Sequence, residues 1–216
     1  MSVKLKTVSL FAGLTDDELR LLESRSFTKT FPKNTVLVTE DDHTDSFYVI
    51  LSGKVKIYVS DEEGKEVVLG TYGAGDYFGE MVLDEGPRSA SVMTLEPSSF
   101  AIISKAEINT LIERHPEMAI HIMKKVIQRA RVLTENVKSL ALLDVYGRVA
   151  RLLLSLASDL NGELVIAENL THQDLANRVG ASREMISRIL KDLSLGGYIK
   201  VEGRKITINK KPPSGW

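Results

Sequence analysis

Residues 77–92, YFGEMVLDEGPRSASV, place charged and small residues in a stretch that otherwise has the composition of β-sheet. Gly79 and Glu80 stand on one side of a Gly-Pro turn, and Arg88 and Ser89 stand on the other. They could be turn residues and a surface ion pair, because glycine and proline are common in turns. They could instead enclose a small anion that carries a sugar. This stretch alone does not distinguish the two interpretations, so the rest of the sequence is needed.

A second group of polar residues lies near the C-terminus, in THQDLANRVGASREMISRILKDL. Thr171 can cap one helix, Gly180 fits a left-handed turn, and Ser182 can cap the next helix. This order of cap, helix, glycine turn, cap and helix is typical of a helix-turn-helix. The apolar residues have the spacing of two helices that bury a shared core: Leu175, Ala176, Val179, Ile186, Ile189 and Leu190.

The outward face of the second helix carries residues that can contact DNA bases. They are Arg183, Glu184, Ser187, Arg188 and Lys191. Arginine can donate two hydrogen bonds to guanine, and glutamate can accept one from cytosine. A solvated helix face with Glu184 and Arg188 as an i,i+4 pair is the alternative, but the caps and the basic charge favour DNA. The segment YIKVEGRKITI predicts a β-wing with Arg204 and Lys205 at its tip, where they can contact phosphate.

Composition and charge narrow the class of protein. The 216 residues are 43% hydrophobic and 26% charged, which is typical of a globular chain. Residues 145–216 hold 11 basic and 7 acidic residues, a balance of +4, and the totals leave 17 and 22 for residues 1–144, a balance of −5. Only residues 145–216 are therefore expected to contact a polyanion. Neither a membrane-spanning run nor a signal peptide is evident, so a cytoplasmic protein is expected.

The absence of cysteine excludes several kinds of site. Disulfides, thiolate-bound zinc, cysteine-bound iron–sulfur clusters and a cysteine nucleophile are all ruled out. Haem would need an axial ligand, and none of the four histidines stands in a setting that singles it out. No metal site and no covalent cofactor are expected.

The elements that must position these residues follow from hydrophobic periodicity. Residues 15–25, TDDELRLLESR, predict a short helix that Thr15 can cap. From about residue 31 to residue 104, short β-branched or aromatic segments alternate with Gly, Asp, Asn and Pro, which predicts a small β-barrel or sandwich. After Lys105 the period becomes helical, and residues 117–143 form one long helical pattern.

This long helix carries a narrow apolar seam with alternating spacings of four and three residues. The seam consists of Ala119, Met123, Val126, Ala130, Leu133, Val137 and Leu140. It could pack against the β-domain of its own chain, but three repeats of the pattern favour a twin helix from a second subunit.

A β-barrel, a seam helix and a winged helix-turn-helix together resemble the catabolite-activator/fumarate-nitrate-regulator (CRP/FNR) family of bacterial transcription factors. The resemblance covers about residues 8–209 and rests on FGEM with PRSASV, on LDVYGRVARLLLSLA, and on THQDLANRVGASREMISRILKDL. It implies an α+β fold with a jelly-roll-like, cyclic-nucleotide-binding β-roll over residues 1–116. A dimerisation helix over 117–143 and a winged helix-turn-helix, DNA-binding domain over 144–216 would follow.

The resemblance also assigns the opening stretch to a phosphate-binding cassette. Backbone N–H groups beside Gly79 would approach the anion, Glu80 would accept from a ribose 2′-hydroxyl, and Arg88 and Ser89 would bind the cyclic phosphate. Arg129 matches a family arginine that pairs with the cassette glutamate. The implied ligand-binding residues are Gly79, Glu80, Arg88, Ser89, Arg129, Leu133 and Thr134.

Two departures from the family pattern bear on the ligand. The loop from Glu80 to Arg88 is a little shorter than usual. At two helix positions where the cyclic-AMP receptor has Thr-Ser over the adenine, this chain has Leu133 and Thr134. A site that loses a polar group discriminates less well between analogues. Cyclic AMP (cAMP) is the first choice, while cyclic GMP, cyclic di-GMP and no ligand at all remain open.

For DNA the resemblance places Arg183, Glu184 and Arg188 where the cyclic-AMP receptor contacts TGTGA-type half-sites. Thr171, His172 and Gln173 match phosphate-contacting positions, with His172 in place of a more basic residue. The implied DNA-binding residues are Thr171, His172, Gln173, Ser182, Arg183, Glu184, Ser187, Arg188, Arg204 and Lys205.

The expected partners are double-stranded DNA, a second copy of the chain and, as a further candidate, RNA polymerase, with no membrane. An enzyme with a regulatory nucleotide domain is disfavoured, because the last 70 or so residues hold no metal cluster, Ser-His arrangement or Walker-type loop. A simple ligand-binding or dimerising module remains open, and so does a constitutive DNA binder with an empty pocket.

Overall fold

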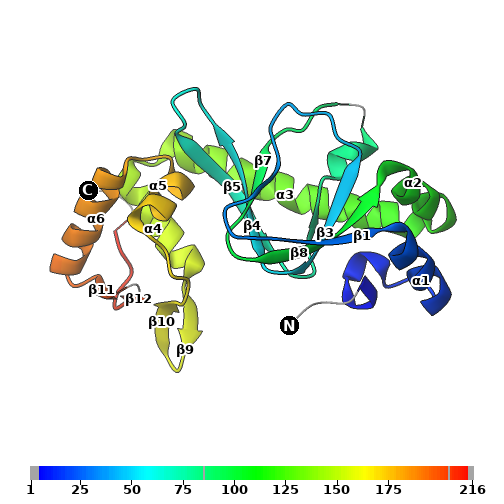
Figure 1. Cartoon of the computed structure of the whole chain (residues 1–216). Coiled ribbons are helices and arrows are strands. Elements are labelled where there is room, and N and C mark those ends of the chain that lie inside the picture. The colour runs from blue at the N-terminus through cyan, green and yellow to red at the C-terminus, as the bar shows by residue number, and fades with distance from the viewer. Residues whose placement is uncertain (1–4, 85, 204, 214–216) are drawn as a thin grey trace. The chain divides into compact units, whose positions relative to one another are not determined.

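The computed structural model describes residues 5–84, 86–203 and 205–213 of the chain (Figure 1). The chain forms two compact units. The first comprises Met1–Val59 and Leu69–Arg131, and the second comprises Ser60–Val68 and Val132–Trp216.

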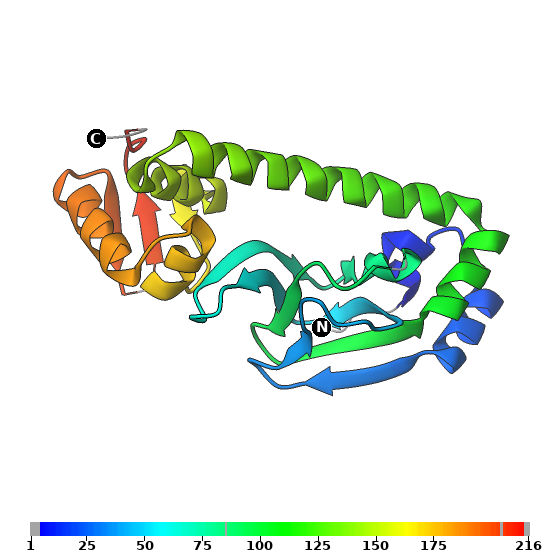
Figure 2. The same ribbon diagram turned by 90° about the horizontal axis from the view of Figure 1, so that it is seen from above.

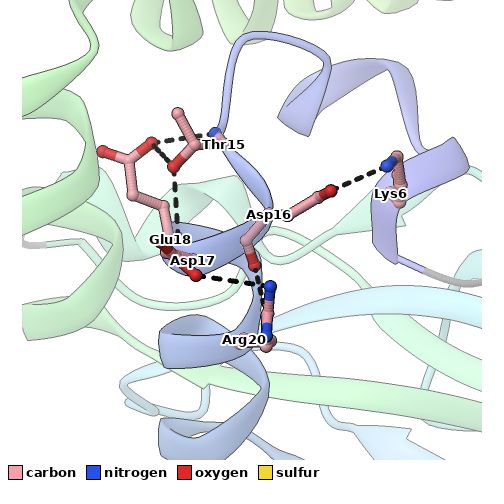
Figure 3. Close-up of polar contacts among 6 residues, drawn as sticks. All are labelled: Lys6, Thr15, Asp16, Asp17, Glu18 and Arg20. Carbon is pink, nitrogen blue, oxygen red and sulfur yellow. Dashed lines mark hydrogen bonds and ion pairs between the residues drawn. The ribbon is translucent and has the colours of Figure 1, made fainter.

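The first unit begins with short helices. Two 3₁₀ turns, η1 (Leu5–Thr7) and η2 (Ser9–Phe11), precede helix α1 (Asp16–Arg25). Figure 3 shows why α1 starts where it does: the Thr15 hydroxyl accepts from the Glu18 N–H, and a Glu18 carboxylate oxygen accepts from the Thr15 N–H at 2.9 Å. This reciprocal capping box satisfies two N–H groups that a helix start leaves unpaired. The predicted helix with Thr15 as its cap is confirmed.

Two four-stranded antiparallel sheets form the body of this unit. One has the strand order β1-β8-β3-β6 and the other has the order β2-β7-β4-β5. Their strands are β1 (Phe27–Phe31), β2 (Val36–Val38), β3 (Ser46–Ser52), β4 (Lys54–Ser60), β5 (Glu66–Gly73), β6 (Tyr77–Phe78), β7 (Ser91–Thr94) and β8 (Ser98–Ser104).

Turn chemistry fixes how the strands connect. Gly53 joins β3 to β4 at a φ of 89°, a left-handed conformation that glycine tolerates best. A Cβ at this position would stand 2.1 Å from the Ser98 Oγ, which itself accepts from the Lys54 N–H. The turn therefore requires glycine for its backbone conformation and for its close neighbour.

The sheets enclose a core of aliphatic and aromatic side chains, among which Phe47, Ile50, Val55, Phe100 and Ile103 are fully buried. A short 3₁₀ turn, η3 (Glu80–Leu83), follows β6, and helix α2 (Lys105–Arg114) follows β8. Helix α3 (Pro116–Leu142) then runs without interruption, as Figure 2 shows. Met118 and Ile122, one turn apart, are its buried residues.

The second unit is built around helices α4 (Val145–Leu156), α5 (His172–Val179) and α6 (Arg183–Leu195). Its sheet has the order β11-β12-β10-β9, with β9 (Ser158–Leu160), β10 (Glu163–Ile166), β11 (Ile199–Glu202) and β12 (Lys205–Ile208). The wing expected from YIKVEGRKITI is the β11–β12 hairpin. The β9–β10 hairpin is an addition to the sequence prediction. The α+β fold of a β-roll, a long helix and a winged helix-turn-helix is confirmed.

Candidate ligand and DNA-binding sites

The side chain of Arg88 donates hydrogen bonds through all three of its nitrogens. Its Nε donates to the Thr44 hydroxyl at 2.9 Å, and its Nη2 donates to the same hydroxyl and to the Ser46 carbonyl at 2.6 Å. Its Nη1 donates to the Gly79 carbonyl at 2.9 Å. The strand β3, the loop before it and the end of β6 thus hold one guanidinium between them.

Among the described residues, no carboxylate forms an ion pair with this buried guanidinium. Arg88 is only 4% exposed, and its hydrogen-bond acceptors among the described residues are neutral oxygens. Burial lowers the pKa of Arg88, although electrostatic interactions with Tyr48, Glu80 and Asp45 oppose that shift. A buried cation with neutral acceptors is under-compensated, so the position is suited to receive an anion.

Gly79 allows the arginine to sit there. Its φ is 87°, and a Cβ at this position would stand 2.8 Å from the Ser46 carbonyl oxygen and 3.1 Å from the Arg88 Nη1. A larger residue would be strained in its backbone and would push the guanidinium aside. The role of this glycine is therefore local and steric, and it keeps the backbone close to the arginine.

Glu80 faces a second arginine. Arg129 of α3 and Glu80 form an ion pair of 2.6 Å, and both side chains are 14% exposed. This is the pairing that the sequence predicts for Arg129. The Arg129 guanidinium also lies 4.4 Å from the centroid of the Tyr72 ring, within the range of a cation–π interaction. Its Nη2 donates to the Tyr77 carbonyl.

The ionisation of this cluster follows from its burial. Burial acts to lower the pKa of Arg129, but the charge and hydrogen bond of Glu80 outweigh it, so the pKa is raised. Burial raises the pKa of Tyr77 to about 12 and also raises that of Tyr72. Arg129 therefore stays charged and the tyrosines stay neutral at physiological pH.

A cavity joins the two arginines and is called the ligand cavity below. Its polar wall consists of Gly79, Glu80, Arg88, Ser89 and Arg129, and its apolar wall of Val38, Ile57, Tyr72, Phe78, Met81, Ala90 and Val92. Five predicted ligand residues thus line one cavity. Its volume is about 60 Å³, whereas pockets for drug-sized ligands typically hold ~300–1,000 Å³. A nucleotide must therefore widen the cavity or extend beyond its rim.

Leu133 and Thr134, the other two predicted ligand residues, lie further along α3, in the part that groups with the second unit. Both are exposed, Leu133 by 40%. Neither lines the ligand cavity as the structure describes it.

The predicted seam of α3 is solvent-accessible in the single chain. Met123, Val126, Leu133, Val137 and Leu140 are 39–64% exposed. Ala119 is half-buried and Ala130 is exposed. A row of large apolar side chains on the outside of a helix is unusual unless a partner covers it.

The helix-turn-helix has the predicted caps. The Thr171 hydroxyl accepts from the Asp174 N–H at 3.1 Å, and Ser182 accepts from the Met185 N–H at 3.2 Å. Between them Gly180 has a φ of 65°. Leu175 and Ile186 are fully buried in the core that α4, α5 and α6 share.

The outward face of α6 carries Arg183, Glu184 and Arg188, all exposed. A hydrogen bond from the Glu184 N–H to its own carboxylate, and a second bond from Ser182, lower the pKa of Glu184. Glu184 is therefore an ionised acceptor beside two cations, as contact with a cytosine amino group requires.

The other predicted DNA residues are partly engaged within the domain. The His172 Nδ1 lies 2.7 Å from the Ser187 Oγ, which donates its own proton to the Arg183 carbonyl. The hydrogen bond between the imidazole and the serine ties α5 to α6. Gln173 donates to Asn177 within α5. Lys205 is exposed at the start of β12, and Arg204 lies outside the described residues.

The sequence prediction missed residues that support the cavity. Thr44 and Ser46 hold Arg88, Tyr72 lies under Arg129, and Asp76 pairs with Lys125 of α3 at 2.7 Å. No local pattern marks them, although the Lys125–Arg129 spacing of four residues places two cations on one face of the helix.

Both halves of the chain match known protein families. Residues 28–115 match the cyclic nucleotide-binding domain family, and residues 147–212 match the Crp-like helix-turn-helix domain family. The chain is 31% identical over 210 residues to the CRP-like cAMP-activated global transcriptional regulator of Mycobacterium tuberculosis, covering 95% of this chain and 94% of that protein.

Two further relatives are informative. The cAMP-activated global transcriptional regulator CRP of Salmonella typhimurium is 33% identical over 199 residues, which cover 90% of this chain and 95% of that protein. The c-di-GMP responsive global regulator CLP of Xanthomonas campestris is 27% identical, with a TM-score of 0.77 over 88% of this chain and 96% of that structure. Among the described residues, no helix has the length and apolar character needed to cross a membrane.

Proposed function

The chain belongs to the CRP/FNR family of cyclic-nucleotide-binding transcription regulators, and we propose that it acts as a ligand-controlled homodimer. The ligand occupies the ligand cavity, and the two recognition helices α6 bind a TGTGA-type palindrome. Cyclic AMP is the proposed effector. The protein is a regulator and not an enzyme, and RNA polymerase is a proposed further partner.

One observation supports this function above the others. Arg88 is a buried cation whose acceptors are neutral, and it stands at the wall of a cavity beside Ser89. Glu80, in the wall of the same cavity, offers a carboxylate that can accept from hydroxyl groups. A cation with a neighbouring hydroxyl and a nearby carboxylate complements a phosphate attached to a ribose. A turn and a surface ion pair would not require this burial.

The identity of the effector rests on the relatives. The proteins at 31–33% identity carry names that state activation by cAMP, whereas the relative at 27% is named for c-di-GMP. The higher identities favour cAMP. A regulator of the same architecture that responds to cyclic di-GMP is the alternative.

A second candidate is a constitutive regulator that binds DNA with no ligand. Two observations favour it: the small volume of the ligand cavity, and the engagement of the Arg88 donors by the protein itself.

The test is a titration of a TGTGA-type palindrome at fixed salt, because DNA affinity depends steeply on salt. It is run without ligand and with cAMP, cyclic GMP or cyclic di-GMP. We expect cAMP alone to tighten binding. Tight binding in all four conditions would instead identify a constitutive regulator, and loosening by cyclic di-GMP would reverse the sign of the switch.

Two variants separate the sites in that assay. Arg88→Leu should abolish the effect of cAMP and leave ligand-free DNA binding unchanged. Arg183→Ala should weaken binding to the palindrome far more than binding to random DNA, because the loss of a base contact affects specific sites. Equal losses on both DNAs would contradict the base-contacting role.

A further inference from the structure

We infer that Thr44 is a positioning residue for the nucleotide phosphate, and that it acts by holding the far edge of the Arg88 guanidinium. This inference rests on the proposed function, since it concerns the same cavity. Thr44 lies in the loop between β2 and β3, outside the cassette stretch of residues 77–92.

The donors of Arg88 are almost fully used. A guanidinium has five N–H groups. The Nε donates to the Thr44 hydroxyl, the two Nη2 protons face that hydroxyl and the Ser46 carbonyl, and one Nη1 proton goes to Gly79. The second proton of Nη1 is left for a ligand.

The engaged edge and the remaining proton face different sides. Gly79 lines the ligand cavity together with Arg88 and Ser89, and Thr44 is not among the residues that line it. Thr44 instead lines a second, polar cavity, which also touches Arg88. The Nε–Nη2 edge therefore points away from the ligand cavity, and Nη1 is the nitrogen beside it. A phosphate would meet Arg88 end-on through Nη1 and not through two parallel bonds.

The Thr44 hydroxyl maintains this orientation. It accepts two guanidinium bonds, so its removal leaves the Nε donor with no acceptor among the described residues and leaves Nη2 with the carbonyls of Thr44 and Ser46 alone. Unpaired donors on a charged group that is 4% exposed would turn toward other acceptors, and Nη1 would move away from the ligand cavity. A serine at position 44 would keep the hydroxyl.

The test compares Thr44→Val, Thr44→Ser and a matched control in the full chain, with cAMP as the probe in isothermal titration. Thr44→Val should bind cAMP about tenfold more weakly or worse, and Thr44→Ser should stay within about threefold of the parent protein. The control is Thr94→Val, which removes another buried hydroxyl of the β-roll, one that donates to Pro32 at 2.7 Å. It should cost stability without changing the affinity for cAMP.

A measurement without ligand separates this inference from the proposed function. The Arg88 Nε–H proton, assigned with Arg88→Lys in a ¹⁵N-arginine spectrum, should exchange slowly in the parent and in Thr44→Ser, and rapidly in Thr44→Val. Slow exchange in the parent with no binding of any cyclic nucleotide would reject the proposed function, but it would support the hydrogen bond by which Thr44 holds Arg88. Unchanged or tighter cAMP binding by Thr44→Val would overturn the positioning role.

Discussion

At the scale of single residues, the ligand cavity combines two arginines with opposite electrostatic surroundings. Arg88 is held by neutral oxygens, and Arg129 is held by the carboxylate of Glu80. The cavity thus contains one cation that pairs with no carboxylate of the described residues, and one ion pair that is already neutral overall. An anionic ligand would gain most from Arg88, because Arg129 is already compensated.

We expect Arg129→Met to destabilise the first unit. The change leaves Glu80 as a carboxylate with a 14% exposed side chain and without the arginine that pairs with it. Removing one partner of a buried pair typically costs about 3–5 kcal/mol, and partial exposure brings the expected cost to about 2–3 kcal/mol. Urea unfolding followed by circular dichroism measures it.

The control for Arg129 is Arg131→Met, which removes an exposed arginine two residues further along the same helix. It should change the free energy of unfolding by less than about 0.5 kcal/mol. The double variant Glu80→Gln/Arg129→Met should recover part of the loss. If Arg129→Met were as mild as Arg131→Met, the ion pair would have no structural role.

Residue pairs outside the cavity give a pH-dependent stability. A hydrogen bond to Glu18, with a second to Glu117, raises the pKa of His115 above 6.5. Bonds from the Thr15 backbone and hydroxyl, together with one from His115, lower the pKa of Glu18 to about 2. The protonated histidine is thus favoured by folding, and so is the ionised carboxylate.

The sign of each effect follows from these shifts. The contribution of His115 is complete below pH 6.5 and is lost as the pH rises through its raised folded pKa. The contribution of Glu18 is complete above pH 4.5 and is lost as the pH falls toward 2. His115→Gln should therefore flatten the decline in melting temperature between pH 6 and pH 8. An unchanged slope in that variant would show that other groups cause the decline.

At the scale of elements, periodicity and caps were predictable because they depend on neighbours in the sequence. Thr15, Thr171 and Ser182 each begin a helix as expected. The β9–β10 hairpin was missed because its strands have only three and four residues. Its signal was Asn161-Gly162, a pair with φ of 59° and 86° that favours a tight hairpin turn.

The supports of the cavity were beyond prediction from local patterns for a different reason. Thr44 and Arg88 are 44 residues apart, and Tyr72 and Arg129 are 57 apart. Their contacts exist only because the sheets and α3 bring distant segments together. A charged residue within a motif can be identified from the sequence, whereas the neutral oxygen that orients it cannot.

Helix α3 gives a prediction at this scale, which concerns assembly. Val137 is 64% exposed, so its replacement by aspartate should not disturb the folded chain. In a dimer joined along the seam, Val137→Asp would bury two like charges against each other. We expect monomer at concentrations where the parent is a dimer, measured by sedimentation. Lys138→Asp, at an exposed neighbouring position, should remain a dimer. A Val137→Asp dimer would place the interface elsewhere.

Arg148 of α4 connects two helix ends in the second unit. Its Nε donates to the Val179 carbonyl at 2.9 Å, at the end of α5, and its Nη1 donates to the Leu143 carbonyl at 3.0 Å, just after α3. The arginine thus ties the end of the seam helix to the turn of the helix-turn-helix. Movement of α3 would be transmitted to α5 through it.

We expect Arg148→Gln to reduce the effect of cAMP on DNA affinity at least fivefold while the affinity for cAMP itself stays near that of the parent. The control is Arg151→Gln, which removes an exposed pair with Glu135 that is worth at most about 1 kcal/mol. Fluorescence anisotropy with and without cAMP measures the ratio. A normal ratio in Arg148→Gln would mean that coupling bypasses this contact.

At the scale of the whole molecule, the proposed function requires that cAMP binding and DNA binding be thermodynamically coupled. If cAMP strengthens palindrome binding by some factor, the palindrome must strengthen cAMP binding by the same factor. Typical couplings are about 5–150-fold. We expect saturating palindrome to lower the dissociation constant of cAMP by the factor measured in the DNA titration. A DNA of scrambled sequence, at the same salt and length, should have less effect, because α6 would then make only phosphate contacts.

The spacing of the half-sites tests the geometry behind that coupling. A dimer places its recognition helices in successive major grooves roughly 34 Å apart, one turn of DNA. Inserting about five base pairs turns the second half-site to the opposite side of the duplex, so one dimer could no longer bind both halves. The inserted palindrome should therefore bind no better than a single half-site, and it should lose its effect on cAMP affinity. If the inserted palindrome kept its tighter binding and its effect on cAMP affinity, the half-sites would be bound independently. The coupling would then have to arise within one subunit.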